Sequence, residues 1–503
     1  MQPLPASSAA APRADGNDAR VTLADLFPEA QGASGGSTRV RDLASDSRKV
    51  SPGSVFVAVP GTTADGSTFV PHALAAGAAA IVGEAEPPPG LAVPYLRVAD
   101  ARRALALAAA RLHPRQPDRV VAVTGTSGKS SVADFARQLF AVLGHRSASL
   151  GTLGVITSEG AAYGSLTTPD PLSLHRTLDR LAGDGIARLA MEASSHGIDQ
   201  RRLDGVRLAA AGFTNLGRDH LDYHGTTEAY VAAKLRLFET LLPDGATAVI
   251  NADGPYANVF LESVRRRGLR EVTTGRAGET IRLLEARTAG FAQRLAVEAF
   301  GRTFSVDMPL PGAFQVENAL LAAGLVVAVE GEERAGDALA GFSRLEGVSG
   351  RLERIGEVDG ALCIVDYAHK PDALAHVLEA LRPFTAGRLV CLFGCGGDRD
   401  RGKRPLMGRI AVEKADVAIV TDDNPRSEEP AAIRAEILKG APGAREIGDR
   451  ALAIRTAVDE LRPGDVLVVA GKGHETGQII GDRTLPFSDH EEVRAAIAGR
   501  QTT

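Results

Sequence analysis

The feature that most restricts the fold is a short apolar segment, Val120 to Thr124, followed by a glycine-rich turn and a helical stretch from Lys129 to Leu143. Similar apolar segments recur at Leu189 to Met191, Ala209 to Phe213 and Ala246 to Ile250. Uninterrupted apolar strands that alternate with helices are typical of a parallel sheet buried on both faces. The sequence therefore predicts an α/β fold.

The chain of 503 residues suggests about three domains at the usual size of ~150 residues each. Residues 1–20 are rich in Ala, Ser and Pro and lack a basic start with an apolar run, so we expect a disordered tail rather than a signal peptide. A first domain is expected over 21–117, a central domain over 118–348 and a third domain over 349–503.

The third domain contains four further apolar strands, and polar or glycine-rich sequence follows each of them. The four loops read Tyr367-Ala-His-Lys370, Gly394-Cys-Gly-Gly-Asp-Arg399-Asp-Arg401, Asp422-Asp-Asn-Pro-Arg426 and Gly471-Lys-Gly-His-Glu475. In α/β sheets, ligands bind beyond the carboxyl ends of the strands. We therefore expect these loops to form one binding face.

Composition excludes several classes of function. The net charge of -5 argues against nucleic acid as the main partner, because duplex-binding proteins usually have a basic face. No segment approaches the ~18 consecutive apolar residues of a membrane span. The three cysteines show neither a disulfide framework nor zinc spacing, which favours a reducing compartment, the cytoplasm.

The turn after the first central strand has the sequence Thr124-Gly-Thr-Ser-Gly-Lys-Ser-Ser131. Glycines let backbone N–H groups turn toward a phosphate, and a helix N-terminus adds partial positive charge. Lys129 would contact the β- and γ-phosphates of ATP, and Ser130 would offer its hydroxyl to Mg²⁺. Val123 stands where the longer phosphate-loop pattern has glycine. Kinases, GTPases and ligases all use such a loop, so it does not name the reaction.

Acidic and histidine residues follow two other central strands. Glu192 ends one strand, where a metal ligand or a strand-end acid would both fit. His220 lies in a loop with Asp222 and His224, and a group of three titratable side chains raises the prospect of a second Mg²⁺ site.

Lys234 lies on one face of a predicted helix with Tyr230 and Phe238, at i, i+4 spacing. The sequence alone favours a lysine whose ammonium reaches water at the edge of that face. The alternative is a buried lysine with a lowered pKa, whose neutral amine reacts with CO₂ to give a carbamate that binds Mg²⁺.

Nine motifs in fixed order together resemble the Mur ligase family, and the resemblance covers the chain from Asp46 to Asp489. They are Asp46-Ser-Arg48, Thr124-Gly-Thr-Ser-Gly-Lys-Ser130, Thr167-Thr-Pro169, Glu192-Ala-Ser-Ser-His196, Asp219-His-Leu-Asp222, Tyr230-Val-Ala-Ala-Lys234, Asp366-Tyr-Ala-His369, Asp423-Asn-Pro-Arg426 and Gly471-Lys-Gly-His-Glu475. The resemblance implies a UDP-binding N-terminal domain, a central P-loop ATPase-like domain and a C-terminal Rossmann-like domain. It also implies an ATP-dependent, mostly monomeric ligase of peptidoglycan precursor synthesis.

Within the family, the motifs are most similar to the ligase that adds the third amino acid to UDP-MurNAc-L-Ala-D-Glu. The resemblance implies that Lys129, Glu192, His220 and Lys234 are catalytic, with Lys234 carbamylated. The Mg²⁺ ligands would be Ser130, Glu192, His220 and the Lys234 carbamate. ATP would contact Gly125, Thr126, Ser127, Gly128, Lys129, Ser130, Ser131, Asn318, Arg351 and Asp366. The UDP-muramyl peptide would contact Ser47, Thr62, Thr63, Ala64, Thr167, Thr168, Ser194, Gln200 and Arg202.

The third domain is expected to select the incoming amino acid. The resemblance places Arg399, Asp423, Asn424, Pro425, Arg426, Gly471 and Glu475 around diaminopimelate. The chemistry agrees, because arginine binds a carboxylate through two parallel hydrogen bonds, and diaminopimelate has a second carboxylate that lysine lacks. The sequence leaves open whether the meso or the LL isomer is used.

This chain departs from the family pattern at two places. Thr62-Thr-Ala64 stands where many members have a His-Gln pair, and Lys370 stands where many have Thr. Three alternatives remain beside the diaminopimelate ligase. They are a ligase that uses L-lysine, a ligase similar to folylpolyglutamate synthetase, and a P-loop nucleotide switch that makes no amide. A nucleotide-binding scaffold without catalysis is disfavoured by the intact set of Lys129, Glu192, His220 and Lys234.

Overall fold

The computed structural model describes residues 21–31, 35–61, 65–162, 166–217 and 219–501. The predicted tail over 1–20 and the residues Thr62–Ala64 lie outside the described residues. Contacts between residues divide the chain into two compact units. The first unit consists of the chain up to Arg115 together with two later segments, Asp170–Asp179 and Arg201–Gly205. The second unit consists of the rest of the chain.

The first unit is built on a small parallel sheet in the order β1-β2-β3-β4. Its strands are β1 (Asp42–Ala44), β2 (Ser54–Ala58), β3 (Ala80–Gly83) and β4 (Tyr95–Arg97). Helix α3 (Ala101–Leu112) packs on this sheet with α1 (Leu23–Leu26), and α2 (Val70–Ala75) packs beside β2. Every residue of β2 is buried, as its continuous apolar sequence requires.

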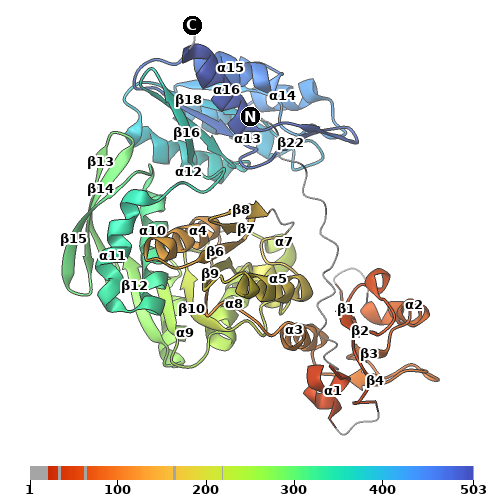
Figure 1. Ribbon diagram of the computed structural model, residues 1–503. Helices are drawn as coiled ribbons and strands as arrows, with labels where there is room; N and C mark the ends of the chain where they lie inside the picture. Colours follow the sequence, from red (N-terminus) through yellow and green to blue (C-terminus); the bar gives the residue numbers. More distant parts are fainter. Residues whose placement is uncertain (1–20, 32–34, 62–64, 163–165, 218, 502–503) are drawn as a thin grey trace. The chain divides into compact units, whose positions relative to one another are not determined.

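The second unit contains a large sheet in the order β15-β14-β13-β12-β11-β10-β5-β9-β6-β7-β8 (Figure 1). Its central strands are parallel: β5 (Arg119–Thr124), β6 (Ser147–Gly151), β9 (Arg188–Glu192), β10 (Leu208–Phe213), β11 (Thr247–Asn251) and β12 (Arg270–Gly275). The phosphate-loop strand β5 lies between β9 and β10. The carboxyl ends of these three neighbours therefore meet at one edge of the sheet.

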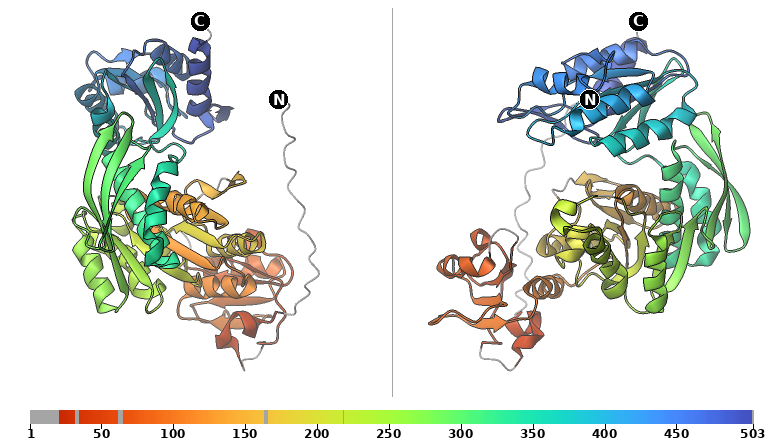
Figure 2. Two further views of the ribbon diagram at one scale, coloured as in Figure 1. Left: turned by 60° about the vertical axis from the view of Figure 1, so that its left-hand side comes forward. Right: turned by 180° about the vertical axis from the view of Figure 1, so that it is seen from behind.

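Antiparallel strands extend this sheet at both ends, and the sequence did not predict them. They are β7 (Gly154–Thr157) and β8 (Gly160–Ala162) at one end, and β13 (Ile281–Ala289), β14 (Ala292–Ala299) and β15 (Arg302–Met308) at the other. Figure 2 shows β13 to β15 as long, extended strands. Buried and exposed residues alternate in β14, so its sequence lacks the continuous apolar run that reveals a central strand.

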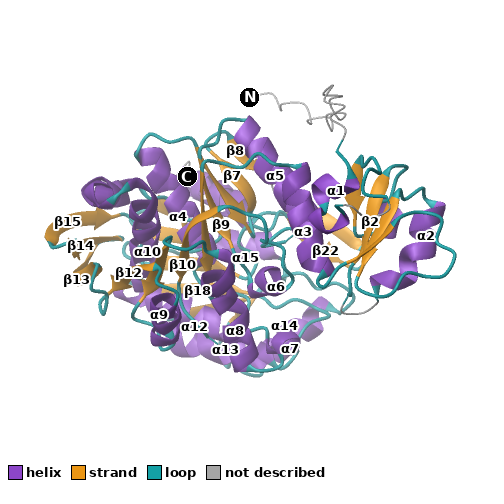
Figure 3. Ribbon diagram, turned by 90° about the horizontal axis from the view of Figure 1, so that it is seen from below, coloured by secondary structure: helices purple, strands orange, loops and turns teal. Residues whose placement is uncertain are grey.

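Helices cover the faces of the sheets (Figure 3). Those of the large-sheet region are α4 (Lys129–Val142), α6 (Ser195–Asp199), α7 (Leu221–His224), α8 (Thr227–Arg236), α9 (Ala257–Arg266), α10 (Ala313–Glu330) and α11 (Ala335–Ala340). Helix α5 (Pro171–Gly183) belongs to the first unit up to Asp179 and to the second from Arg180. Contrary to the sequence expectation, one segment, helix α10, is long and apolar enough to cross a bilayer, but 67% of it is buried inside the protein. It packs against α4, β10, β11 and β12, as the core helix of a globular domain does.

A second sheet follows in the order β16-β17-β21-β18-β19-β20. Its strands are β16 (Glu353–Val358), β17 (Ala361–Asp366), β18 (Leu389–Phe393), β19 (Val417–Val420), β20 (Arg445–Glu446) and β21 (Val466–Ala470). Helices α12 (Pro371–Leu381), α13 (Lys403–Lys414), α14 (Pro430–Leu438), α15 (Arg450–Asp459) and α16 (Asp489–Gln501) surround it, and β22 (Gly477–Ile480) and β23 (Arg483–Pro486) form a hairpin.

Strands β17, β21, β18 and β19 are parallel neighbours. The four polar loops singled out in the sequence therefore lie at one edge, as predicted. The α/β class is confirmed, and the predicted strands are found to within one or two residues. The domain boundaries at residues 117 and 348 stay a prediction.

Candidate functional site

The phosphate loop lies between β5 and α4, where its glycines permit close approaches that other residues would not. Gly128 has a φ of +85° and precedes the first turn of α4. A Cβ on Gly128 would lie 2.3 Å from Asn318 Oδ1, and one on Gly125 would lie 1.9 Å from Thr214 Oγ1. Both positions therefore require glycine, and the predicted ATP residue Asn318 lies against the loop.

Lys129 begins α4 and folds back over the loop. Its Nζ donates to the carbonyl oxygens of Gly125 at 2.9 Å and Thr126 at 3.0 Å. Burial lowers the pKa of Lys129, while Glu192 and Asp219 oppose that shift. The ammonium is thus partly removed from water and held by two carbonyls of the loop that is expected to bind phosphate.

Glu192 is brought together with Ser130, as the predicted metal set requires. Glu192 ends β9 and is 2% exposed. The Ser130 hydroxyl and the Thr152 backbone N–H each donate to Glu192 Oε1 at 2.8 Å. The Thr152 hydroxyl also hydrogen-bonds with Thr167 at 2.9 Å. Sequence reasoning missed Thr152, because a lone threonine after β6 carries no motif.

Lys234 is buried, which corrects the expectation that it reaches water. It is 1% exposed, and its Nζ donates to Gly125 O at 2.8 Å and lies 4.4 Å from the centroid of the Tyr230 ring. Burial lowers its pKa well below the ordinary value, and the charge of Lys129 adds to the effect. The Gly125 carbonyl makes burial possible, because it gives the amine an acceptor inside the protein. A neutral amine is the form that reacts with CO₂.

His220 lies in a cluster of aromatic and imidazole rings. Its ring centroid is 4.7 Å from that of His196, which is 4.1 Å from Tyr223 and 5.5 Å from His224. Burial lowers the pKa of His220, opposed by the Asp219 charge. His196 was part of a sequence motif, but it was not predicted as a site residue.

Lys370, the departure from the family pattern, donates to Asp219 Oδ1 at 3.1 Å, and its side chain is 56% exposed. Among the described residues, no group of three or more His, Cys, Asp or Glu could hold a metal ion. The predicted set differs from such a group, because it includes a serine hydroxyl and a modified lysine.

The remaining predicted ATP residues lie near the start of the second sheet. Asp366 ends β17, is 6% exposed and accepts hydrogen bonds from the backbone N–H groups of Leu352 and Ala368, both at 2.7 Å. Burial raises the pKa of Asp366, and the nearby Arg351 opposes this. The Arg351 guanidinium lies 4.9 Å from the centroid of the Tyr367 ring.

Predicted UDP-substrate residues are divided between the two units. Thr168 is 1% exposed and accepts from the backbone N–H of Ser194 at 3.0 Å, while its own hydroxyl donates to Glu192 O at 2.9 Å. Gln200 donates to the Tyr223 hydroxyl at 3.1 Å. Ser47 and Arg202 belong to the first unit.

The predicted diaminopimelate residues gather at the edge of the second sheet. Arg426 has a φ of +53°, and its Nη1 donates to Gly397 O at 2.9 Å. Asn424 is 4% exposed, and its Nδ2 donates to Glu475 Oε2 at 2.8 Å. The left-handed backbone at Arg426 is uncommon for a residue other than glycine, and such conformations concentrate at functional sites.

Close packing brings the loops after β18 and β21 against the loop after β19. A Cβ on Gly397 would lie 1.8 Å from Pro425 O, and a Cβ on Gly471 would lie 2.8 Å from Asp423 Oδ2. Arg399 is exposed, and its Cγ lies 3.8 Å from where a Cβ on Gly396 would be. The structure thus brings all seven predicted residues to one edge.

Family models match most of the chain. The Mur ligase family, catalytic domain, matches residues 39–113; the Mur ligase middle domain matches 123–326; and the Mur ligase, glutamate ligase domain matches 350–473. The chain belongs to the Mur ligase family.

Curated relatives of this Mur ligase span almost all of its length. The UDP-N-acetylmuramoyl-L-alanyl-D-glutamate--2,6-diaminopimelate ligase of Bradyrhizobium diazoefficiens is 56% identical and covers 96% of this chain and 98% of its own. The ligase of the same name from Agrobacterium fabrum is 55% identical over 92% of this chain and 94% of its own.

A solved structure of a UDP-N-acetylmuramoyl-L-alanyl-D-glutamate--2,6-diaminopimelate ligase superposes on this Mur ligase with a TM-score of 0.73. It is 34% identical, and the match covers 96% of this chain and 100% of the solved one. A folylpolyglutamate synthase of Mycobacterium tuberculosis has a TM-score of 0.60 at 19% identity, a likeness of fold alone. The predicted three-domain Mur ligase architecture is confirmed.

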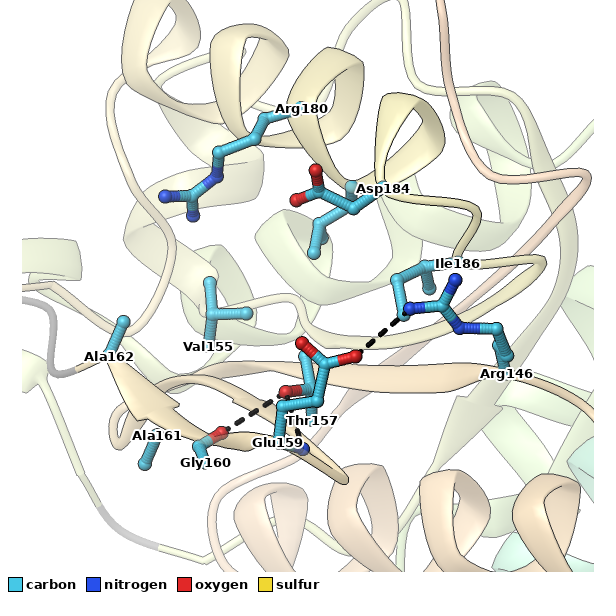
Figure 4. A pocket seen from close by; sticks show the side chains of 11 residues that line it. Arg146, Val155, Thr157, Glu159, Gly160, Ala161, Ala162, Arg180, Asp184 and Ile186 are labelled. Atoms are coloured by element: carbon cyan, nitrogen blue, oxygen red, sulfur yellow. Dashed lines mark hydrogen bonds and ion pairs between the residues drawn. The ribbon is translucent and has the colours of Figure 1, made fainter. Parts of the chain in front are cut away.

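Two surface hollows of the Mur ligase lie away from the predicted residues. One of about 280 Å³ lies between the β7–β8 hairpin and the end of α5, where Arg146 pairs with Glu159 at 3.1 Å (Figure 4). The other, of about 420 Å³, lies beside the first turn of α10 and includes Asp253 and Glu317. Neither hollow contains a residue that the sequence motifs single out.

Gly151→Ala is expected to lower ATP turnover by about 100-fold, because displacing a catalytic group by about 1 Å has effects of this size. The new Cβ would lie 2.0 Å from Glu192 Oε1, so the carboxylate must leave its bonds to Ser130 and Thr152. The measurement is steady-state ATP turnover. Gly499→Ala is the control, because its Cβ meets nothing within 4 Å. Equal rates for the two variants would contradict the assignment of Glu192.

An ion pair between Arg404 and Glu428 connects to the loops that are predicted to bind diaminopimelate. The fully buried Arg404 donates to Glu428 Oε1 at 2.8 Å and Oε2 at 3.0 Å. Glu428 also accepts from the backbone N–H of Asp398 at 2.7 Å. These bonds, first those from Arg404, lower the pKa of Glu428 to about 2. No local sequence pattern could reveal the pair, since its members lie 24 residues apart.

Glu428→Gln is expected to lower the melting temperature at pH 7, with a difference from the unsubstituted protein that narrows in acid. The folded pKa lies below the ordinary value of 4.5, so the contribution is present above pH 4.5 and is lost as pH falls toward 2. Thermal unfolding at pH 7, 4 and 3 tests this, with the exposed neighbour Glu429→Gln as control. A difference that stays constant down to pH 3 would contradict it.

Proposed function

We propose that this Mur ligase joins diaminopimelate to the D-Glu carboxylate of UDP-MurNAc-L-Ala-D-Glu, with hydrolysis of ATP to ADP and phosphate, in the synthesis of peptidoglycan precursors. The observation that carries the substrate assignment is that Arg426 and Glu475, one cation and one anion, both lie in loops at one edge of the second sheet. A guanidinium suits the distal carboxylate of diaminopimelate, and a carboxylate suits its ammonium. The names of the curated relatives support the same assignment.

The reaction needs activation, because a carboxylate is a poor acyl donor. One D-Glu carboxylate oxygen attacks the γ-phosphorus of ATP, the bond to the ADP oxygen breaks, and an acyl phosphate forms. The free amine of diaminopimelate then attacks the acyl carbon, loses a proton, and phosphate leaves with the bonding electron pair. Lys129 is placed to stabilise the negative charge that builds when the two anions meet.

Mg²⁺ fits the residues beside the phosphate loop. The buried Glu192 carboxylate and the Ser130 hydroxyl, 2.8 Å apart, are the hard oxygen donors that this ion prefers. His220 and a carbamate on Lys234 would complete the predicted set. When bound, Mg²⁺ supplies positive charge that offsets repulsion between phosphate and carboxylate.

The UDP-muramyl peptide is proposed to contact Ser47, Thr62 to Ala64, Thr167, Thr168, Ser194, Gln200 and Arg202. The hydrogen bonds that join Thr168 to Ser194 and to the Glu192 strand support this, since they tie a substrate residue to the ATP site. We place the enzyme in the cytoplasm as a monomer, with ATP and both other substrates as its partners.

The test is phosphate release with UDP-MurNAc-L-Ala-D-Glu, ATP and Mg²⁺, comparing meso-diaminopimelate, LL-diaminopimelate and L-lysine, with mass analysis of the product. A tripeptide with one diaminopimelate isomer and little with lysine is expected. Turnover with lysine alone would keep the ligase and overturn the assignment of Arg426. ATP hydrolysis without an amide product would favour a nucleotide switch.

A further inference from the structure

Lys472 lies in the loop after β21, and no step above uses it. Its side chain is fully buried, and its Nζ donates to Asn424 Oδ1 and Glu475 Oε2, both at 3.0 Å. Both partners are predicted diaminopimelate residues. Glu475 is 33% exposed, so a ligand can reach the carboxylate that Lys472 holds from inside.

The same contacts fix the orientation of the Asn424 amide. Its Oδ1 accepts from Lys472 Nζ and from the backbone N–H of Ile479 at 2.9 Å, while its Nδ2 donates to Glu475 at 2.8 Å. An amide with two donors at its oxygen and an acceptor at its nitrogen has one favourable orientation. Loss of Lys472 would remove both a donor to Asn424 Oδ1 and the cation beside Glu475.

Stability alone does not account for this arrangement. A buried ion pair costs much of its electrostatic gain in desolvation, and apolar replacements are often neutral. The buried Arg450, by contrast, binds Asp489 and the Ala470 carbonyl, and so ties structural elements together. Both hydrogen bonds from Lys472 instead reach side chains that are predicted to contact diaminopimelate.

We propose that Lys472 is a positioning residue for the amino-acid substrate. Its ammonium sets the Asn424 amide and holds Glu475 in place, so that the ammonium of diaminopimelate joins a carboxylate that is already oriented and already has one cationic partner. This role rests on the proposed function of the site and extends it, because Lys472 itself does not touch the substrate.

Lys472→Met is expected to raise the KM for diaminopimelate by about 10- to 100-fold, as misplaced binding groups do. The KM values for ATP and the UDP-muramyl peptide should not change. Lys472→Gln, which keeps a donor without the charge, should give a smaller rise, and it provides the same comparison if Lys472→Met does not fold. Arg388→Met is the control, because Arg388 pairs with Asp465 at 2.6 Å at the opposite end of β18 and β21.

A double-mutant cycle with Glu475→Gln tests the coupling. Glu475→Gln leaves the Lys472 ammonium buried without an anion, so the melting temperature should fall, and adding Lys472→Met should restore it. The effects on the KM for diaminopimelate should be less than additive, because both variants break the same arrangement.

Three results would overturn the role of Lys472. They are an unchanged KM for diaminopimelate in Lys472→Met, an equal rise in all three KM values, and strictly additive effects in the cycle. Failure of the unsubstituted protein to make any diaminopimelate product would instead overturn the proposed function, and this role with it.

Discussion

Lys129→Met is expected to lower kcat by about 100- to 1,000-fold, the usual effect of removing one preorganised charge from a transition state. In the structure the Lys129 ammonium is held by two loop carbonyls, at 2.9 and 3.0 Å, and the negative charge of Glu192 acts on it. Methionine has a similar length and shape, and it removes a cation whose pKa is already lowered by burial. The loop should therefore keep its fold while losing its charge.

The measurement is kcat and the KM for ATP, with circular dichroism to check folding. Lys414→Met is the control, because Lys414 lies in the last turn of α13 and pairs with Glu379 at 2.6 Å. A folded Lys129→Met protein with normal kcat would show that the loop does not stabilise the phosphoryl transfer.

Arg426→Met is expected to lower kcat/KM for diaminopimelate by about 100- to 1,000-fold, the loss of two charge-assisted hydrogen bonds. Turnover of L-lysine should fall far less, because lysine lacks the distal carboxylate that Arg426 is proposed to bind. The ratio of the two kcat/KM values therefore reports on Arg426 itself. Any general damage to the enzyme would lower both values together.

Competition between diaminopimelate and L-lysine, with mass analysis of the tripeptides, measures that ratio directly. Arg445→Met is the control, because Arg445 is exposed and pairs with Glu460 at 2.6 Å. An Arg426→Met enzyme that keeps the preference of the unsubstituted protein would place the specificity determinant elsewhere.

The sequence predicted those parts of the fold that have strong local patterns. Continuous apolar strands such as β5 were found to within one residue of the predicted bounds, and the glycine turn before Lys129 indicated the position of the phosphate loop. Strands β13 to β15 were missed, because their partly exposed residues lack a continuous apolar run.

At the site, the contacts between residues far apart in the sequence could not be predicted. Helical spacing placed Lys234 on the same face as Tyr230, but only the structure shows the Gly125 carbonyl that lets the amine remain buried. Likewise, no pattern connects Arg404 with Glu428. The predicted site residues came from the motifs and the family resemblance, whereas the residues that hold them in place are seen only in the three-dimensional packing.

The loop that carries Arg426 is held by its main chain. The Arg426 N–H donates to Ile479 O at 3.0 Å, the Gly481 N–H donates to Arg426 O at 2.7 Å, and the Gly397 N–H donates to Asn424 O at 2.9 Å. None of these bonds depends on the side chain at position 426. A substitution at position 426 should therefore leave the loop folded, provided that it avoids β-branched residues, which the φ of +53° disfavours. The substrate preference that we propose for this edge could therefore change in evolution without loss of the fold of the domain.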